Sequence, residues 1–400
     1  MQDNEKKPAL RFKGFTDPWE QRKLGEVFEE YSEKNHAELP PLTIIQGGGT
    51  IRRDESERAL QYDKSSLSNY KMVNKDDFIV HLRSFEGGLE KASSQGIISP
   101  AYHTFHGEDV DSRFYYAYFR SKNFINKDLK PHVYGIRDGR SIDIEGMKTI
   151  RIPWASYPEQ KSIGDFLTHL DTLITLHQRK YEKLLNIKKS MLDKMFPQNG
   201  VSVPEIRFKG FTDPWEQRKI SELAEKTYGG GTPTTSNEAF WNGNIPWIQS
   251  SDIVDGKLMG VEPRKYITQT GLNNSATQLV PKDSIAIITR VGVGKLAYMP
   301  FSYSTSQDFL SLSKLNTEPF FTVYACYKKL QSELNTVQGT SIKGITKDEL
   351  LAKTISVPVY SEQKQIGSFF TQLDTLITLH QRKLEKLQNI KKSCLEKMFV

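Results

Sequence analysis

Cysteine is scarce in this 400-residue sequence, and long apolar runs are absent. Cys326 and Cys394 are the only cysteines, and two cysteines can build neither a disulfide framework nor, by themselves, a zinc site. No stretch of roughly 18 apolar residues occurs, so we expect no membrane-spanning helix. The opening residues, MQDNEKKPALRFKGF, lack the apolar region of a signal peptide. Together these absences favour a cytoplasmic protein.

Sequence motifs of catalysis are missing as well. We find no Asn-Pro-Pro-Tyr motif of a methyltransferase, no Gly-x-Gly-x-x-Gly, no Walker A motif, no His-Glu-x-x-His and no convincing pair of nuclease carboxylates. The eight histidines and two cysteines do not follow the spacing of metal ligands. The sequence therefore predicts no catalytic residue, no metal site and no cofactor in this chain. A site assembled from distant loops stays open as the alternative.

Positive charge is in excess. The chain has 55 Lys and Arg against 48 Asp and Glu, which gives a net charge of +7 and a pI near 9.0. This excess favours an anionic partner, most simply nucleic acid, although a soluble protein that is merely basic is the alternative. The length suggests two or three domains, and 37% hydrophobic residues are enough to build their cores.

Two segments occur twice. RFKGFTDPWEQRK at Arg11–Lys23 returns unchanged at Arg207–Lys219. The block Glu159–Phe196 returns as Glu362–Phe399, with 30 of the 38 aligned residues identical and LDTLITLHQRK repeated in full. Solenoid repeats are only about 20 to 50 residues long, so the wide spacing indicates the duplication of a whole two-part unit.

The repeats divide the chain into six segments. Each half has a repeated leader, a variable block and a repeated block, and a linker rich in Pro, Asn and Gly joins the halves. We predict boundaries at residues 1–23 for the first leader, 24–157 for the first variable block, 158–197 for a long helix, 198–219 for the linker and second leader, 220–360 for the second variable block, and 361–400 for a second long helix.

The repeated block predicts a long amphipathic helix. Its apolar residues recur every three or four positions in one continuous stripe. A helix of this length would measure about 57 Å, and so long a stripe needs a partner of equal length, which the second copy supplies. The basic runs are interpreted as a solvated face, with contact to DNA as the minor alternative. We expect antiparallel pairing through Ile163, Leu170, Leu173, Leu184, Ile366, Leu373, Leu376 and Leu387.

The variable blocks differ in sequence but share landmarks. NKDDFIVHLRSF resembles PKDSIAIITRVG, and each places an arginine, Arg83 or Arg290, after a run of strand type. MKTIRIP and AKTISVP correspond near the ends of the two blocks. Short β-branched and aromatic runs separated by Gly, Asn and Asp turns predict one mixed α/β fold that occurs twice.

Candidate DNA-binding residues lie in turn-rich segments. The second block contains YGGGTPTTSNEAFWNGNIPWIQSSDI, in which glycines let the backbone approach a ligand and amide and hydroxyl groups suit base edges. That these glycines only form turns is an equal alternative, and Trp247 is expected in the core. The candidates in this block are Gly230, Thr232, Thr234, Ser236, Gln249, Ser250, Arg290, Lys295, Ser341 and Lys343.

The first block contributes arginines. QGGGTIRRDE and YGIRDGRSID contain glycine turns, and guanidinium groups on such turns can hold phosphates or guanine. The alternative is that these arginines serve only solubility. The candidates in this block are Arg52, Arg53, Arg83, Arg137 and Arg140.

These features together resemble one known family. SEQKQIGSFFTQLDTLITLHQRKLEKL with its earlier copy, YGGGTPTTSNEAFWNGNIPWIQSSDI, VPKDSIAIITRVGVGKLAYM and GTSIKGITKDELLAKTISVP are similar to the specificity subunit of type I restriction–modification enzymes. The resemblance implies an α+β fold, in which two globular mixed α/β target-recognition domains are separated by two long antiparallel coiled-coil helices and related by a pseudo-two-fold repeat.

The resemblance also implies a function and partners. Each recognition domain would read one half of an asymmetric two-part DNA target, and the paired helices would set the gap between the halves. Two modification subunits carrying S-adenosylmethionine would dock on the helices and methylate adenine, and two restriction subunits using ATP and Mg would complete the complex. The chain itself would have no catalytic activity. The alternatives are a stand-alone DNA endonuclease with a dispersed site and a coiled-coil protein scaffold.

Overall fold

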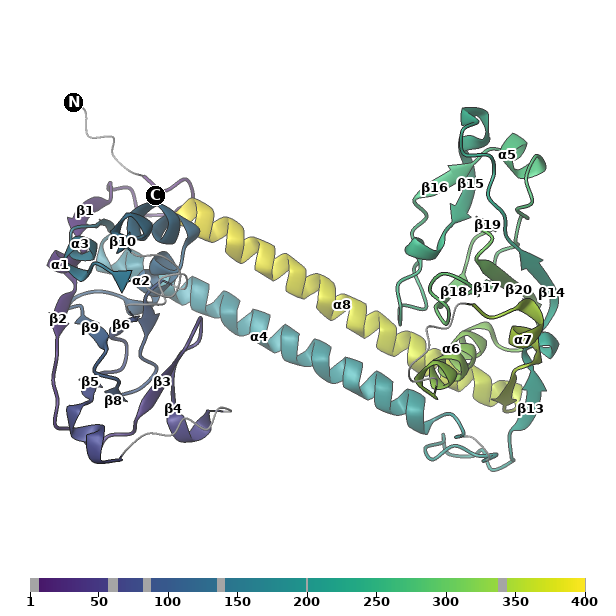
Figure 1. The fold of residues 1–400 in the computed structure, drawn as a ribbon, viewed down its shortest axis with the longest axis horizontal. Coiled ribbons are helices and arrows are strands. Elements are labelled where there is room, and N and C mark those ends of the chain that lie inside the picture. Colours follow the sequence, from purple (N-terminus) through teal and green to yellow (C-terminus); the bar gives the residue numbers. More distant parts are fainter. Residues whose placement is uncertain are drawn as a thin grey trace. The chain divides into compact units, whose positions relative to one another are not determined.

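The computed structural model describes residues 7–56, 64–81, 88–134, 141–198, 201–336 and 344–399. The chain divides into two compact units, which we call unit 1 (Met1–His177 and Lys383–Val400) and unit 2 (Gln178–Arg382) (Figure 1). Each unit holds one variable block together with a part of both long helices. The predicted boundaries follow the repeats instead and give each long helix a segment of its own.

The repeated leaders form equivalent strands in the two units. In unit 1, β1 (Glu20–Lys23) pairs antiparallel with β12 (Arg151–Trp154), and in unit 2, β13 (Glu216–Lys219) pairs antiparallel with β21 (Thr354–Val357). The registers correspond, since the first residue of each leader strand faces the last residue of its partner. Each leader therefore ties the start of its variable block to the end of that block.

Both variable blocks contain a four-stranded antiparallel sheet. When the four strands are counted along the chain, their order across the sheet is first, fourth, second, third in both units. The prediction of one mixed α/β fold that occurs twice is thereby confirmed. In sheet order the strands are β2 (Glu29–Tyr31), β9 (Tyr102–His106), β6 (Phe78–His81) and β7 (Glu90–Lys91) in unit 1, and β14 (Ala224–Gly229), β20 (Phe309–Leu315), β17 (Ser284–Ile288) and β18 (Leu296–Met299) in unit 2.

Smaller elements complete each unit. In unit 1 they are α1 (Leu24–Val27), β3 (Leu42–Ile45), β4 (Gly49–Arg52), β5 (Lys71–Val73), β8 (Gly96–Ile98), α2 (Ser112–Phe119), β10 (Val133–Tyr134), β11 (Ser141–Ile142) and α3 (Ile144–Lys148). In unit 2 they are β15 (Trp241–Ile248), β16 (Lys265–Ile267), α5 (Gln269–Asn273), β19 (Ser304–Thr305), α6 (Pro319–Thr336) and α7 (Lys347–Ala352). Strands β16, β15 and β19 form a sheet that lies, with α5, at the end of unit 2 away from α8 (Figure 1). We call this the distal end of unit 2.

The two long helices are α4 (Tyr157–Lys194) and α8 (Tyr360–Met398). In unit 1 the start of α4 runs antiparallel to the end of α8. The Leu10 N–H, beside the start of α4, donates to the Lys397 carbonyl at 3.0 Å, whereas further along α4 Asp171 pairs with Lys391 at 2.5 Å. In the described part of the chain, no helix is long and apolar enough to cross a membrane.

Unit 2 repeats this arrangement with the helix ends exchanged. The Ile206 N–H donates to the Lys194 carbonyl near the end of α4 at 2.9 Å. Lys188 pairs with Asp374 at 2.5 Å. Because these two residues are the repeat equivalents of Lys391 and Asp171, one helix–helix ion pair occurs once in each unit.

The residues predicted to pair the helices fall into three groups. Ile163, Leu170 and Leu387 join the core of unit 1, and Leu184, Ile366 and Leu373 join the core of unit 2. Leu173 is half-buried. Leu376 is 43% exposed, so its place on the pairing stripe was wrong. Leu373 and Ile377 lie one turn apart and face inward. Leu376 precedes Ile377, so its side chain points about 100° away from that of Ile377 around the helix.

The first turn of each long helix holds the leader. In unit 1 Glu159, which is 1% exposed, accepts from the Arg11 guanidinium at 2.6 and 2.8 Å and from the Trp19 indole at 3.0 Å. In unit 2 Glu362 accepts from Arg207 at 2.7 and 2.8 Å. These hydrogen bonds raise the pKa of both guanidinium groups.

The next residue of each long helix holds the variable block. The Gln160 amide oxygen accepts from the Asp111 backbone N–H at 3.0 Å, just before α2. The Gln363 amide oxygen accepts from the Glu318 backbone N–H at 2.8 Å, just before α6. A Glu-Gln pair at the start of α4 and α8 therefore fixes leader, variable block and helix together, and this explains why that part of the sequence is repeated.

Candidate nucleic-acid interface

The glycine run of unit 2 forms a loop that packs closely on its surroundings. A Cβ at Gly230 would overlap the carbonyl oxygen of Ser306, and one at Gly231 would lie 2.5 Å from the backbone nitrogen of Thr277. The Gly231 N–H donates to the Thr305 carbonyl at 2.9 Å. Glycine is required here because only a residue without a side chain permits this approach. The glycines act as structural residues that deliver the next residue to the surface.

That next residue, Thr232, meets the turn between β19 and β20. Its hydroxyl donates to the side-chain amide oxygen of Gln307 at 2.6 Å, and both side chains are exposed. The neighbouring Asp308 carbonyl accepts from the backbone N–H of Thr289 at 2.7 Å and from its hydroxyl at 3.0 Å. This places Arg290, also exposed, beside the same turn. The structure thus places two predicted candidates beside one turn, and that turn contains Gln307, which sequence reasoning missed.

Two tryptophans support this surface from within unit 2. Trp247 is 4% exposed and its indole donates to the Gly231 carbonyl at 3.0 Å, which confirms its expected place in the core. The Trp241 ring packs edge-on against it at 5.1 Å between centroids. The Lys265 ammonium lies 5.7 and 5.8 Å from the two ring centroids. An exposed cation is therefore held next to the glycine loop, and no local pattern around Lys265 indicates this position.

The other described candidates of unit 2 differ in exposure. Thr234 and Ser236 are exposed, whereas Lys295 is half-buried at the start of β18. Gln249 and Ser250 are half-buried and begin a short 3-10 turn, in which the Gln249 N–H donates to Asp252 at 3.0 Å. Gln249 and Ser250 thus close a turn of the backbone, and Thr234 and Ser236 belong to the exposed distal end.

The glycine run of unit 1 has a different environment. It forms the turn between β3 and β4, where the N–H groups of Gly47 and Gly49 donate to the Glu90 carboxylate at 2.7 and 3.2 Å. Glu90 is buried and also accepts from Arg120 at 2.5 Å and from the Tyr116 hydroxyl at 2.9 Å. Burial is the main cause that raises the pKa of Tyr116. Here the glycines anchor a hairpin to an internal carboxylate.

The two described arginine candidates of unit 1 both contact the protein. Arg52 is exposed and pairs with Asp54 at 2.8 Å, and the hydrogen bonds between them raise the pKa of Arg52. Arg53 lies over the Tyr70 ring at 5.1 Å and donates to the Leu42 carbonyl at 3.3 Å. Arg53 thus stabilises its own loop, and Arg52 keeps an accessible guanidinium. Five further candidates lie outside the described residues: Arg83, Arg137, Arg140, Ser341 and Lys343.

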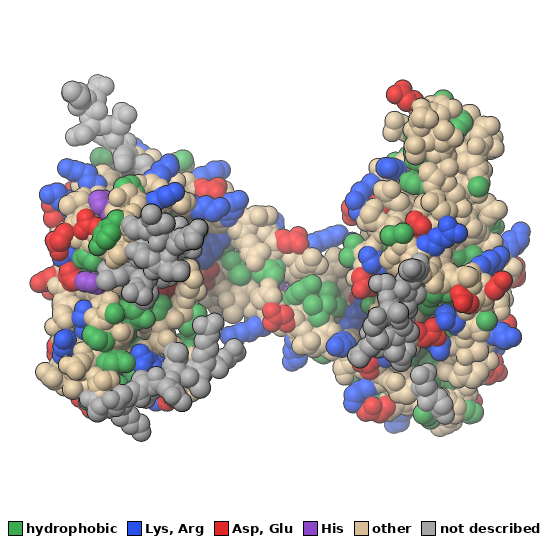
Figure 2. Space-filling model, viewed as in Figure 1, with side chains coloured by type: hydrophobic (Ala, Val, Ile, Leu, Met, Phe, Trp, Pro, Cys, Tyr) green, Lys and Arg blue, Asp and Glu red, His purple; other side chains and the backbone are tan. Residues whose placement is uncertain are grey.

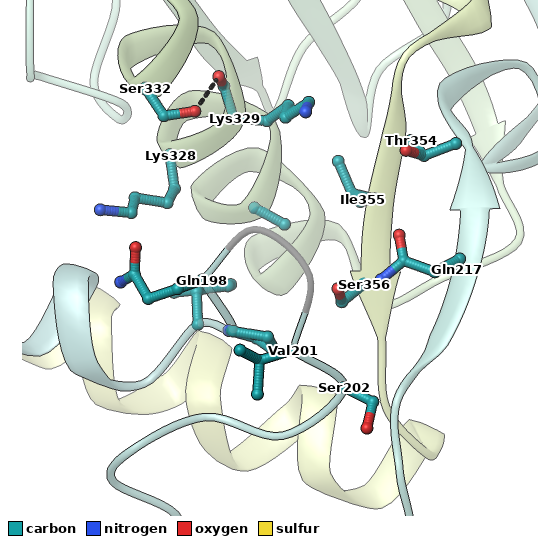
Figure 3. Close-up of a pocket in the computed structure, with 13 residues that line it drawn as sticks. Gln198, Val201, Ser202, Gln217, Lys328, Lys329, Ser332, Thr354, Ile355 and Ser356 are labelled. Atoms are coloured by element: carbon teal, nitrogen blue, oxygen red, sulfur yellow. Dashed lines mark hydrogen bonds between the residues drawn. The ribbon is translucent and has the colours of Figure 1, made fainter. Parts of the chain in front are cut away.

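A cavity of about 400 Å³ lies elsewhere in unit 2, between α6, the chain after α4, and the strand pair β13–β21 (Figure 3). Lys328 on its wall pairs with Asp193, and Gln217 donates to the Ser356 hydroxyl at 2.7 Å. Its described lining includes none of the predicted DNA-binding residues. The cavity therefore belongs to the junction of leader and helix, apart from the distal end.

A family model matches most of the chain, once in each half. It is described as the type I restriction modification DNA specificity domain, and it covers residues 16–186 and 212–389. Each match contains one leader strand, one variable block and a large part of one long helix. The two matched segments therefore coincide with the duplication seen in sequence and structure.

Individual relatives agree with this match. The chain is 22% identical over 400 residues to the putative type I restriction enzyme MjaX specificity subunit of Methanocaldococcus jannaschii, covering 94% of this chain and 91% of that protein. It is 30% identical over 169 residues to a type I restriction enzyme specificity subunit of Escherichia coli, covering 40% and 41%. The crystal structure of a type I restriction-modification S subunit from M. genitalium has the same fold, with a TM-score of 0.64 at 14% identity over 98% of this chain and 99% of that one.

Proposed function

The chain belongs to the DNA specificity subunits of type I restriction–modification enzymes, and we propose that each of its units reads one half of an asymmetric two-part DNA target. The observation that carries this proposal is a repeated frame with two unlike surfaces. Leader strand, sheet order and helix contacts correspond in the two units, whereas the contacts of the two glycine runs differ. Two unlike readers in one chain fit two unlike half-sites, in contrast to the palindrome of a homodimer.

We propose that the paired helices set the gap between the half-sites. Both α4 and α8 contribute to both units. A change in helix length would therefore change the gap between the half-sites that the two units read. Readers on one side of B-DNA contact half-sites about one helical turn, roughly 34 Å, apart. A spacer of fixed length gives a gap of fixed length without reading its sequence.

The long helices also offer surfaces for partners. A shallow groove on α4 in unit 2 is lined by Arg179, Glu182, Lys183, Asn186 and Ile187, among others, and most of these residues recur in the second copy on α8. Leu176 and Leu379, which are repeat equivalents, are both exposed. A surface that occurs twice suits two copies of one partner. We propose that two modification subunits dock on these repeated helix surfaces and that two restriction subunits complete the complex.

In this proposal the chemistry belongs to the partners. The modification subunits would bind S-adenosylmethionine and methylate adenine at N6, after flipping the base out of the stack. The restriction subunits would use ATP and Mg. The specificity subunit would recognise the target sequence and supply no catalytic group, cofactor or metal of its own. The complex would act in the cytoplasm.

Methylation mapping tests the assignment of readers. Cells that express this chain with its modification subunits should methylate one asymmetric two-part sequence. A chain in which residues 220–360 also replace residues 24–157 should methylate a target with two identical, inverted halves. An unchanged target would contradict the proposal. Purified chain with DNA and Mg should not cleave, and cleavage would favour a stand-alone endonuclease.

A helix insertion tests the spacer. Four residues, about one turn, inserted into the exposed middle of one long helix should lengthen the unspecified gap. Four residues inserted at the exposed linker residue Val203 are the matched control and should leave the gap unchanged. Equal gaps in both variants would contradict the proposal that the helices set the gap. Sequence-independent DNA binding with little salt dependence would favour a protein scaffold.

A further inference from the structure

We propose that Gln307 is a base-reading residue of unit 2 and that the base is an adenine which stays stacked in the target half-site. This inference rests on the proposed function and deepens it. No sequence pattern marks Gln307, because it is one residue in a short turn between β19 and β20. Its role emerges from the contacts that the fold gives it.

The side chain of Gln307 has a fixed orientation. The Thr232 hydroxyl donates to its amide oxygen at 2.6 Å, so the amide nitrogen is turned away from Thr232. Among the described residues, no group accepts a hydrogen bond from that nitrogen. An exposed side chain that is already oriented loses less conformational freedom when it binds.

The backbone on both sides of this pair is closely packed. Gly230 and Gly231 pack so closely on the β19–β20 turn and on Thr277 that a side chain at either position would collide. The turn is also tied to β15, since the Ser306 N–H donates to the Ile248 carbonyl at 2.9 Å. The glycine run therefore acts as a support that sets the distance between Thr232 and Gln307.

The surroundings suit a nucleic acid. Arg290 and Lys265 are exposed cations on neighbouring segments, and such cations can hold phosphates. The Asp308 carboxylate next to Gln307 accepts from the Ser306 hydroxyl at 3.2 Å. Most of the distal surface in Figure 2 is tan, which marks side chains that are neither charged nor hydrophobic, together with backbone. Such a surface suits base edges more than a protein partner.

The chemistry of the amide selects adenine. Its nitrogen offers two donors, and its oxygen keeps one lone pair beside the hydrogen bond from Thr232. Adenine presents an acceptor, N7, next to a donor, the N6 amino group, in the major groove, and glutamine pairs with both. Guanine presents two acceptors there and leaves the amide oxygen without a donor. The methylated adenine itself is excluded, because a flipped base no longer presents this edge in the groove.

The experiment uses the full chain assembled with its modification subunits and DNA carrying 7-deazaadenine at single positions of the unit 2 half-site. This base still pairs with thymine but lacks the N7 acceptor. One position should lower the methylation rate of the unaltered complex about tenfold to a hundredfold. With Gln307→Ala the same position should have no further effect, because the contact is already lost. Thr232→Val should weaken the effect of that position without abolishing it.

Gln269→Ala is the matched control. Gln269 is an exposed glutamine of the same unit, held by Asn273 at 2.9 Å. In the Gln269→Ala complex, 7-deazaadenine should have the same effect at every position as in the unaltered complex. Gln307→Glu keeps the size of the side chain and should lose adenine preference, which separates reading from folding. If Gln307→Ala retains the full 7-deazaadenine effect, the inference is overturned. If the unaltered complex shows no sequence preference that depends on this chain, the proposed function fails instead.

Discussion

Unit 1 and unit 2 carry nearly the same glycine-rich run and use it differently. In unit 1 the glycine N–H groups of the run donate to the buried Glu90 carboxylate and close a hairpin. In unit 2 the run packs against Ser306 and Thr277 and presents Thr232 to Gln307. The same short pattern therefore has no fixed role. What it contacts across the chain decides whether it anchors a turn or supports a recognition surface.

The repeated leaders and long helices of the two units agree far more closely, yet two details of their contacts differ. The Trp19 indole donates to Glu159, whereas the buried Trp215 indole nitrogen has no hydrogen-bond partner among the described residues. The helix ion pair is also more buried in unit 2, with Lys188 and Asp374 at 10% and 18% exposure, than in unit 1, with Lys391 and Asp171 at 31% and 53%. Identical residues thus sit in unequal environments, and this inequality is measurable.

The largest expected effect comes from removing the buried glutamates. Glu159→Ala and Glu362→Ala each leave a guanidinium without its partner and should lower the free energy of unfolding of their own unit by about 3–5 kcal/mol. Glu159→Ala should cost roughly 1 kcal/mol more, because it also removes the Trp19 hydrogen bond. Chemical denaturation, monitored by hydrogen exchange in each unit, measures the loss of unfolding free energy for both variants. The exposed Glu182→Ala is the control, and equal losses would remove the distinction between the units.

The glycine run gives the next largest effect, confined to unit 2. Gly230→Ala should lower the stability of that unit by about 1–3 kcal/mol, since the added methyl group overlaps the Ser306 carbonyl. Gly229→Ala is a matched control one residue away, because a Cβ there meets nothing within 4 Å. Thermal unfolding compares the two variants. Similar melting temperatures would show that the loop yields to the extra group.

The helix ion pairs sharpen the comparison further. Asp374→Asn should lower the free energy of unfolding by about 1–2 kcal/mol, because it also weakens a hydrogen bond from the buried Tyr324 hydroxyl at 2.6 Å. Asp171→Asn, its repeat equivalent, should cost less than about 0.5 kcal/mol, as expected for an exposed pair. Urea denaturation of the two variants provides the numbers. A larger loss for Asp171→Asn would reverse the burial argument.

The smallest expected effect is a difference in acid response. Burial alone would raise the pKa of Glu30 in unit 1, but hydrogen bonds with Lys148 and His103 outweigh it and lower that pKa. A lowered carboxyl pKa contributes stability that is present above pH 4.5, its ordinary value, and is lost as the pH falls through the lowered value. In unit 2, burial raises the pKa of Glu318, so the ionised carboxylate destabilises this unit at neutral pH, and the cost is relieved as the pH falls through the raised pKa.

Hydrogen exchange of each unit between pH 7 and about pH 3 tests this difference, because the loss in unit 1 lies below pH 4.5. Unit 1 should lose protection relative to unit 2 at the acidic end. Glu30→Gln should remove part of that loss, and Glu318→Gln should flatten the response of unit 2. A parallel response of both units in the unaltered chain would show that these two carboxyl groups do not govern acid stability.

The frame could be predicted from sequence because it is repeated. Identity over the leaders and long helices indicated two equivalent halves, and helical spacing placed six of the eight pairing residues in the two cores. The reason for the identity needed coordinates. Gly164 and Gly367, for example, allow the carboxylates of Asp111 and Glu318 to approach the long helices closely, and no local pattern reveals such a contact.

The candidate interface was predicted less completely for the same reason. Thr232 was chosen from its own loop, but Gln307 lies 75 residues away and joins it only in the folded chain. The glycine-containing turn predicts a DNA-binding role for Arg53, yet Tyr70 and the Leu42 carbonyl hold this side chain. Short-range composition identifies turn-rich segments. It does not distinguish side chains that stabilise a loop from those that are available to a ligand.

The core of unit 1 contains Cys394, Met398 and Phe399, from the last turns of α8 and the residue after it. During synthesis, the core of unit 1 therefore cannot close until the end of α8 has been translated and has left the ribosome. Unit 2 ends at Arg382 and is complete earlier, although most of its sequence is made later. The usual N-to-C order of domain folding is reversed for these two units, and a premature stop within the last turns of α8 would damage the unit whose variable block is synthesised first.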